Sequence, residues 1–245
     1  SHGRGLWVLD DITPMRVLAD NSTKLVKPRD TYRFGYHWWQ IYGGGVYGGQ
    51  KNYFVQNHRP GHTFYELGMV NGEMKRKYID AGDAKPNGVM IYYNLETASA
   101  DATLTIAETD GTEIISYEGE AISKKAGLNR FVWDMRYPNA LAIPGKPKPN
   151  VRPYCKPGKY LVKLTVNGQT QLEEFEVFMN PNENYTQADA KARFALWMKI
   201  RDKYSEVSAA IIEAQELAKN TDNETVKKAA KDLEASMTAV GTTLV

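Results

Sequence analysis

Short segments of alternating apolar and polar residues fill the middle of the chain, from residue 87 to residue 180. Turn signals separate several of them, among them Asp110-Gly111 and Asn167-Gly168, which favour tight hairpins. Short strands at this spacing are typical of an antiparallel β-sandwich of the immunoglobulin or fibronectin-III type. The apolar face of each strand should then line a core between two sheets. The side chains expected in that core are Phe131, Trp133, Tyr160, Val162, Leu164 and Val166.

Beyond Thr186 the apolar spacing changes to that of amphipathic helices. Thr186 and Asp189 have the spacing of a capping box, and Thr221 with Glu224 predicts the cap of a second helix. Since the connection is short, residues 181–245 are predicted to form a C-terminal antiparallel helical hairpin, which makes the fold mainly β with α. The apolar side chains expected to pack on the neighbouring helix or the sandwich are Phe194, Trp197, Ile211 and Leu233.

Residues 1–86 have no sustained period. A short strand pattern at Leu6–Leu9 comes before a stretch rich in glycine and aromatic residues, in which residues 43–49 predict a flexible loop. So long an irregular stretch is unusual inside a compact domain, and we interpret it as an arm that packs on another element. The proline-rich stretch 138–157 is predicted to be a second irregular segment, extended and exposed.

The arm contains a cluster of aromatic residues with a histidine among them. Flat rings beside polar groups suit stacking on a sugar ring or on a peptide proline, so the cluster is a candidate site for a carbohydrate or peptide ligand. The alternative is that the rings pack the arm against another element. The candidate residues are Tyr36, His37, Trp38, Trp39, Tyr42 and Tyr47.

No complete catalytic motif occurs in the sequence, and no catalytic residue is assigned. Residues 43–48 match the dinucleotide pattern Gly-x-Gly-x-x-Gly, but no helical period follows to hold a pyrophosphate, so no cofactor is expected. His58 and His62 have the spacing of metal ligands on a helix. Because Pro60 and Gly61 lie between them, we expect loop histidines and no metal site.

Composition narrows the classes of partner. The net charge of +2 gives no strong field for nucleic acid, so no nucleic-acid partner is expected. Cys155 is the single cysteine, which excludes an intrachain disulfide. No apolar run reaches the roughly 18 residues of a membrane helix, so no membrane span is expected.

Several segments resemble one family. Residues 2–14 and 27–33 are similar to the last propeller strand and exit segment of bacterial sortilin-like, BNR-repeat, glycosyl-hydrolase-like proteins. Residues 87–93 and 126–138 are similar to the C-terminal sandwich of those proteins, while 157–164 resembles a strand of hook-capping-type immunoglobulin-like domains. The segment from Tyr36 to Glu73 departs from the family pattern and is interpreted as an insertion.

The resemblance implies a propeller-exit strand and arm over residues 1–86, an immunoglobulin-like sandwich over 87–180 and the helical hairpin over 181–245. It also implies a secreted, periplasmic or cell-envelope location and an N-terminal β-propeller of the same polypeptide as partner. The leading expectation is a non-catalytic accessory module that aids carbohydrate or peptide binding. Two alternatives stay open: a part of a glycoside-hydrolase cleft, and a protein–protein interaction module.

Overall fold

The computed structural model describes residues 11–17, 22–33, 64–70, 73–78, 88–98 and 101–243, and only the backbone of 64–70, 73–78 and 237–243. These residues divide into two compact units, each considered by itself. Unit 1 contains the described residues up to Asp134 together with Gly158–Asn182. Unit 2 contains Met135–Pro157 and the residues from Glu183 onward.

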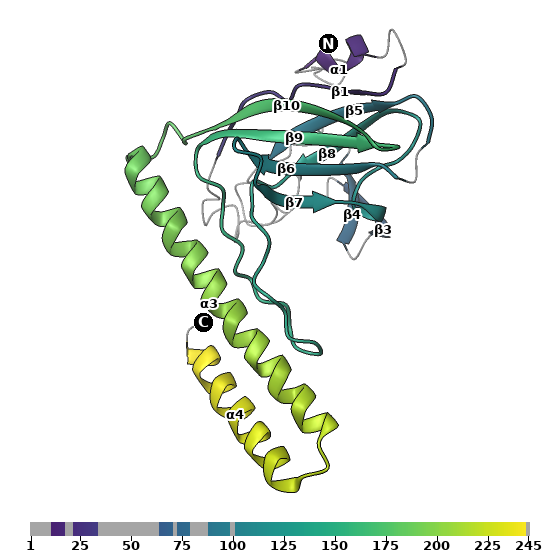
Figure 1. Cartoon of the computed structure of the whole chain (residues 1–245). Coiled ribbons are helices and arrows are strands. Elements are labelled where there is room, and N and C mark those ends of the chain that lie inside the picture. The colour runs from purple at the N-terminus through teal and green to yellow at the C-terminus, as the bar shows by residue number, and fades with distance from the viewer. Residues whose placement is uncertain are drawn as a thin grey trace. The chain divides into compact units, whose positions relative to one another are not determined.

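Unit 1 is a β-sandwich, as the alternating pattern predicts (Figure 1). Within the described ranges, one sheet has the order β1-β5-β8 and the other the order β2-β10-β9-β6-β7. The first sheet consists of β1 (Lys24–Leu25), β5 (Val89–Leu95) and β8 (Gly127–Trp133). The second consists of β2 (Thr31–Tyr32), β6 (Thr103–Glu108), β7 (Glu113–Tyr117), β9 (Gly158–Val166) and β10 (Gln169–Phe178), and the short 3-10 helix η1 spans Gly119–Ala121.

The core between the sheets is built around aromatic rings. Trp133 of β8 is fully buried, and its ring lies edge-on to Tyr160 of β9 at 5.6 Å and to Phe175 of β10 at 6.0 Å, measured between ring centroids. Five of the six expected core residues are buried; Phe131 is half-buried and packs on Tyr117 at 4.5 Å. Phe131 differs because its partner Tyr117 belongs to β7, an edge strand of the second sheet among the described strands, whereas Trp133 contacts the interior strands β9 and β10.

Residues 22–33 differ from the irregular arm that the sequence predicts. Leu25 pairs with Tyr93, so β1 extends the first sheet, while β2 adds a parallel edge to β10. The Gln171 side chain joins the two sheets, because it accepts a hydrogen bond from the Leu25 amide and donates one to the Thr23 carbonyl, both at 2.8 Å. This part of the arm is therefore integral to the sandwich.

Three further elements lie in the region predicted to be irregular. Helix α1 spans Thr13–Val17, and the Asp11 carboxylate accepts a hydrogen bond from the Thr13 amide at its start. Strands β3 (Phe64–Val70) and β4 (Glu73–Tyr78) form an antiparallel hairpin with a register shift between Glu66 and Gly68. The predicted strand Leu6–Leu9 lies outside the described residues.

Unit 2 contains the predicted helical hairpin, formed by α3 (Gln187–Asn220) and α4 (Glu224–Thr243). The capping box is present: Thr186 Oγ1 accepts from the Asp189 amide at 3.2 Å, and the Asp189 carboxylate accepts from the Thr186 amide at 2.9 Å. Hydrogen bonds from Thr186 hold the pKa of Asp189 below its usual range. The second cap is Asn223 and not Thr221, since Asn223 Oδ1 accepts from the Thr225 and Val226 amides.

The predicted packing of the hairpin is right for some side chains and wrong for others. Ile211 is buried, and Phe194 is half-buried against Tyr137. Trp197 is 43% exposed and Leu233 52% exposed, contrary to the expectation. Leu233 is exposed because α4 turns Ala230 and Glu234 toward α3 instead, as the buried Ala230 and the Gln215–Glu234 hydrogen bond show.

Candidate interaction surface

The aromatic residues predicted to bind a ligand all lie outside the described residues. This holds for Tyr36, His37, Trp38, Trp39, Tyr42 and Tyr47, and for the histidine pair His58 and His62. Their role stays a prediction. The described side chains with polar or apolar contacts of interest lie in the interior of the sandwich and in the helical unit.

Polar groups inside the sandwich hold a loop in place. The Tyr93 hydroxyl donates to the Ser123 carbonyl at 2.5 Å, and Asn129 Nδ2 donates to the carbonyls of Lys125 and Gly127 at 2.8 Å each. Asn129 Oδ1 is hydrogen-bonded to the Ser123 hydroxyl. These contacts tie residues 123–127 to β5 and β8, because a buried polar group without a partner would cost free energy. Their role is structural.

Burial raises the pKa of Tyr93 to about 12. Because this value exceeds the ordinary 10.0, the protonated phenol adds stability below pH 10, and that contribution is lost as the pH rises toward 12. We expect the Tyr93→Phe variant to show a shallower fall in unfolding free energy over this interval than the parent chain. Urea denaturation at several pH values measures it, with Tyr92→Phe as the control that retains the steeper fall. Equal slopes for all three proteins would contradict this assignment.

The proline-rich stretch of unit 2 is a paired ribbon and not a simple exposed loop. Arg136 forms a β-bridge with Tyr154, and backbone hydrogen bonds join Tyr137 to Pro153 and Ala140 to Val151. Its base is buried, including Cys155, while residues 144–148 at the tip are exposed as predicted. The base is less exposed because it has its own cross-ribbon partners and contacts α3, whereas Leu141 and Asn150, nearer the tip, are exposed.

The ribbon packs along one side of α3 (Figure 1). Tyr137 contacts Phe194 at 4.9 Å between ring centroids, and the Lys156 ammonium lies 5.3 Å from the centre of the same Phe194 ring. Farther along, the Leu141 amide donates to the Ser205 hydroxyl at 3.0 Å. The ribbon therefore covers the side of α3 that carries Phe194 and Ser205.

A second side of α3 carries a regular apolar seam. Its positions alternate in steps of three and four residues, the spacing of helices that pack along their length. Burial along the seam is uneven: Ile211 and Ala214 are buried, whereas Trp197 and Ile200 are exposed. The seam positions are Trp197, Ile200, Tyr204, Val207, Ile211, Ala214 and Ala218.

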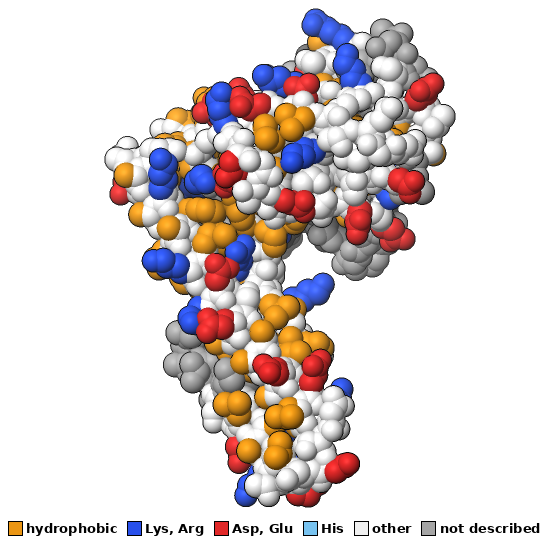
Figure 2. Space-filling view, in the orientation of Figure 1, with side chains coloured by type: hydrophobic (Ala, Val, Ile, Leu, Met, Phe, Trp, Pro, Cys, Tyr) orange, Lys and Arg blue, Asp and Glu red, His pale blue; other side chains and the backbone are white. Residues whose placement is uncertain are grey.

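The first two seam residues, Trp197 and Ile200, together with Leu196 form what we call the α3 patch. Leu196, Trp197 and Ile200 are 59%, 43% and 45% exposed. Ile200 lies four residues after Leu196 and three after Trp197, so both neighbour it on the helix surface. Figure 2 shows apolar side chains interspersed with charged ones along the helices. Sequence reasoning expected Trp197 to be packed and did not single out Leu196 and Ile200, although the three-and-four spacing was a signal that could have found them.

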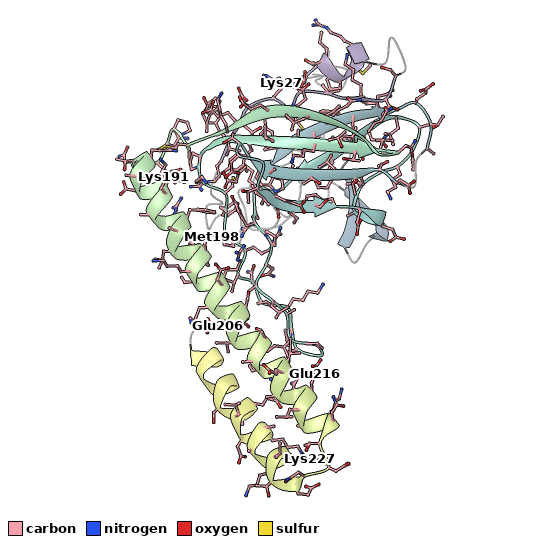
Figure 3. The ribbon with its side chains drawn as sticks, in the orientation of Figure 1. Lys27, Lys191, Met198, Glu206, Glu216 and Lys227 are labelled. Carbon is pink, nitrogen blue, oxygen red and sulfur yellow. The ribbon has the colours of Figure 1, made fainter. Side chains whose placement is uncertain are left out.

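The charged side chains from Ala190 to Arg201, the stretch of α3 that contains the α3 patch, are all cations. No Asp or Glu occurs from Ala190 to Arg201, and the first carboxylate beyond, Asp202, is paired with Arg201 at 2.6 Å. Figure 3 labels Lys191 near the start of α3 and Glu206 and Glu216 in its later half. The cations of this stretch are Lys191, Arg193, Lys199 and Arg201, whereas Lys203, just beyond it, is paired with Glu206 at 2.6 Å.

The part of the chain that the structure describes has no cluster of His, Cys, Asp and Glu side chains suited to a metal ion. Within the same ranges, no helix combines the length and the apolar character that crossing a bilayer requires.

Comparisons with known proteins do not identify a family for this chain. No protein-family model matches the chain, and no curated protein matches it. Among solved structures, the chain is similar to the crystal structure of CopC from Methylosinus trichosporium OB3b. The identity is 20%, the match covers 40% of this chain and 80% of that chain, and the TM-score is 0.22. At these values the similarity carries no argument about function.

Proposed function

We propose that this chain is a non-catalytic accessory module from the C-terminal region of a secreted or envelope β-propeller protein of the sortilin-like, BNR-repeat class. The resemblance of residues 2–14 to a propeller exit and of 126–138 to the family's sandwich supports the origin. The exposed α3 patch is the observation that carries the binding role, because contiguous exposed apolar side chains mark interaction sites.

The interior of unit 1 supports a scaffold role. Aromatic rings of Trp133, Tyr160 and Phe175 fill the space between the sheets, and Tyr93 and Asn129 use their polar groups to hold backbone carbonyls. In this proposal the propeller of the same polypeptide is the first partner. A carbohydrate or peptide is the ligand, bound through the aromatic residues between Tyr36 and Tyr47.

The proposal is tested by assaying the chain against aryl glycosides and peptides, and by probing a glycan array with the chain alone and with a longer chain that includes the propeller. We expect no turnover, and glycan or peptide binding that Trp39→Ala weakens and Trp39→Phe preserves. Turnover that a single carboxylate substitution in this chain abolishes would contradict the proposal. It would favour the alternative of a glycoside-hydrolase cleft.

A further inference from the structure

The α3 patch continues a surface that a helix already occupies. Over its later half, the α3 seam is covered by α4, where Ile211, Ala214 and Ala230 are buried and Gln215 donates to Glu234 at 2.7 Å. Trp197 and Ile200 lie fourteen residues before Ile211 and Ala214, which is two repeats of the seam. The patch therefore belongs to the same helix-binding face.

The described part of α4 extends along only part of α3. At about 1.5 Å per residue, α3 with 34 residues is about 51 Å long and α4 with 20 residues about 30 Å. Because α4 folds back after the short connection Thr221–Asn223, it can cover α3 only as far as about residue 201. Figure 1 shows α4 ending beside the middle of α3. Leu196, Trp197 and Ile200 lie beyond that point.

We propose that the α3 patch binds an amphipathic helix with acidic flanking residues, stacked end to end with α4. This rests on the proposed binding function and names the class of partner. The seam spacing fits a helix, since α4 fills the same seam farther along. The acidic character follows from Arg193 and Lys199, which flank the patch on a stretch of α3 that carries no carboxylate between Ala190 and Arg201.

α4, which covers the later half of the seam, also carries a carboxylate on the side that meets α3. Its Glu234 accepts from Gln215 of α3 and lies 3.9 Å from the Lys146 ammonium of the ribbon, so α4 places a carboxylate near a cation where it covers α3. A second copy of this chain fits less well. Two copies related by a two-fold axis at the patch would bring Arg193 and Lys199 of one copy toward the same cations of the other.

The test uses the full chain and two labelled synthetic helical peptides of about three heptads, each with leucine at the a and d positions. One peptide has glutamate at the flanking e and g positions and the other has lysine. By fluorescence anisotropy, we expect the acidic peptide to bind at least about tenfold more tightly than the basic one. Trp197→Ala and Ile200→Ser should each weaken that binding several-fold, and Arg193→Glu combined with Lys199→Glu should reduce or reverse the preference.

Leu172→Ser is the matched control, because Leu172 is an exposed leucine of β10 in unit 1. It should leave peptide binding unchanged, and Trp197→Phe should keep most of it, while circular dichroism verifies the helices of every variant. Equal binding of both peptides would overturn the inference. A dimer of the chain, seen by sedimentation and dissociated by Trp197→Ala, would also overturn it. So would binding of phosphatidylserine vesicles that depends on Trp197 and occurs without peptide binding. None of these outcomes produces glycoside turnover, so they are distinct from failure of the proposed function.

Discussion

Replacing Trp133 by alanine is expected to lower the free energy of unfolding of the sandwich by about 3–5 kcal/mol, the range for truncating a large aromatic residue in a core. Trp133 is fully buried, and its ring contacts Tyr160 and Phe175, which belong to the opposite sheet. The substitution leaves a cavity where three rings meet, and it removes a contact that holds the two sheets together. Urea denaturation followed by far-ultraviolet circular dichroism measures the loss.

Trp197→Ala is the matched control for this result, because the same truncation is made at a side chain that is 43% exposed. Its cost should be well under half that of Trp133→Ala. Trp133→Phe should recover part of the stability by refilling some of the volume. Similar losses for Trp133→Ala and Trp197→Ala would show that Trp133 is not the centre of the core.

Gly88→Ala is expected to destabilise the sandwich by about 1–3 kcal/mol, the range for forcing extra atoms into a packed interior. Gly88 comes directly before β5, and a Cβ there would lie 2.4 Å from the Trp133 carbonyl oxygen and 2.8 Å from Val132 Cγ1. The backbone of β8 would have to move, which would shift Trp133 in the core. The same denaturation measurement detects the loss.

The control Gly158→Ala distinguishes the steric clash at Gly88 from backbone strain. Gly158 has a φ of +149°, close to the +157° of Gly88, but a Cβ there meets no atom within 4 Å. Both substitutions share the cost of placing alanine at a positive φ, so the difference between them reports the contact with Trp133. If Gly158→Ala destabilises the protein as much as Gly88→Ala, the close approach is not the cause.

The candidate interaction surface was only partly predictable. The helical period placed Trp197 on an apolar face, and Thr186 with Asp189 marked the start of α3 correctly. The side of α4 that meets α3 was predicted wrongly, because Val226 and Leu233 are the more apolar positions, whereas Ala230 and Glu234 make the contact. Small side chains allow close approach of two helices, and a glutamate with partners can lie at the interface, so hydrophobicity alone did not identify the packed side.

The sequence by itself determined the features that depend on near neighbours in the chain. The alternation in β9 placed Tyr160, Val162 and Leu164 in the core, and Asn167-Gly168 makes the predicted tight turn, with φ of 49° and 79°. These features follow from a period of two and from the backbone freedom of the turn residues.

Only the tertiary structure decided the features that depend on remote partners. β1 and β2 are two residues long each, too short for any period, and they exist because Leu25 meets Tyr93 and Thr31 meets Val177. Cys155 is buried because the ribbon pairs with itself and packs along α3. The α3 patch lies beyond the part of α3 that the described residues of α4 cover. In each case the free energy comes from a contact between residues far apart in the chain, which a local pattern does not encode.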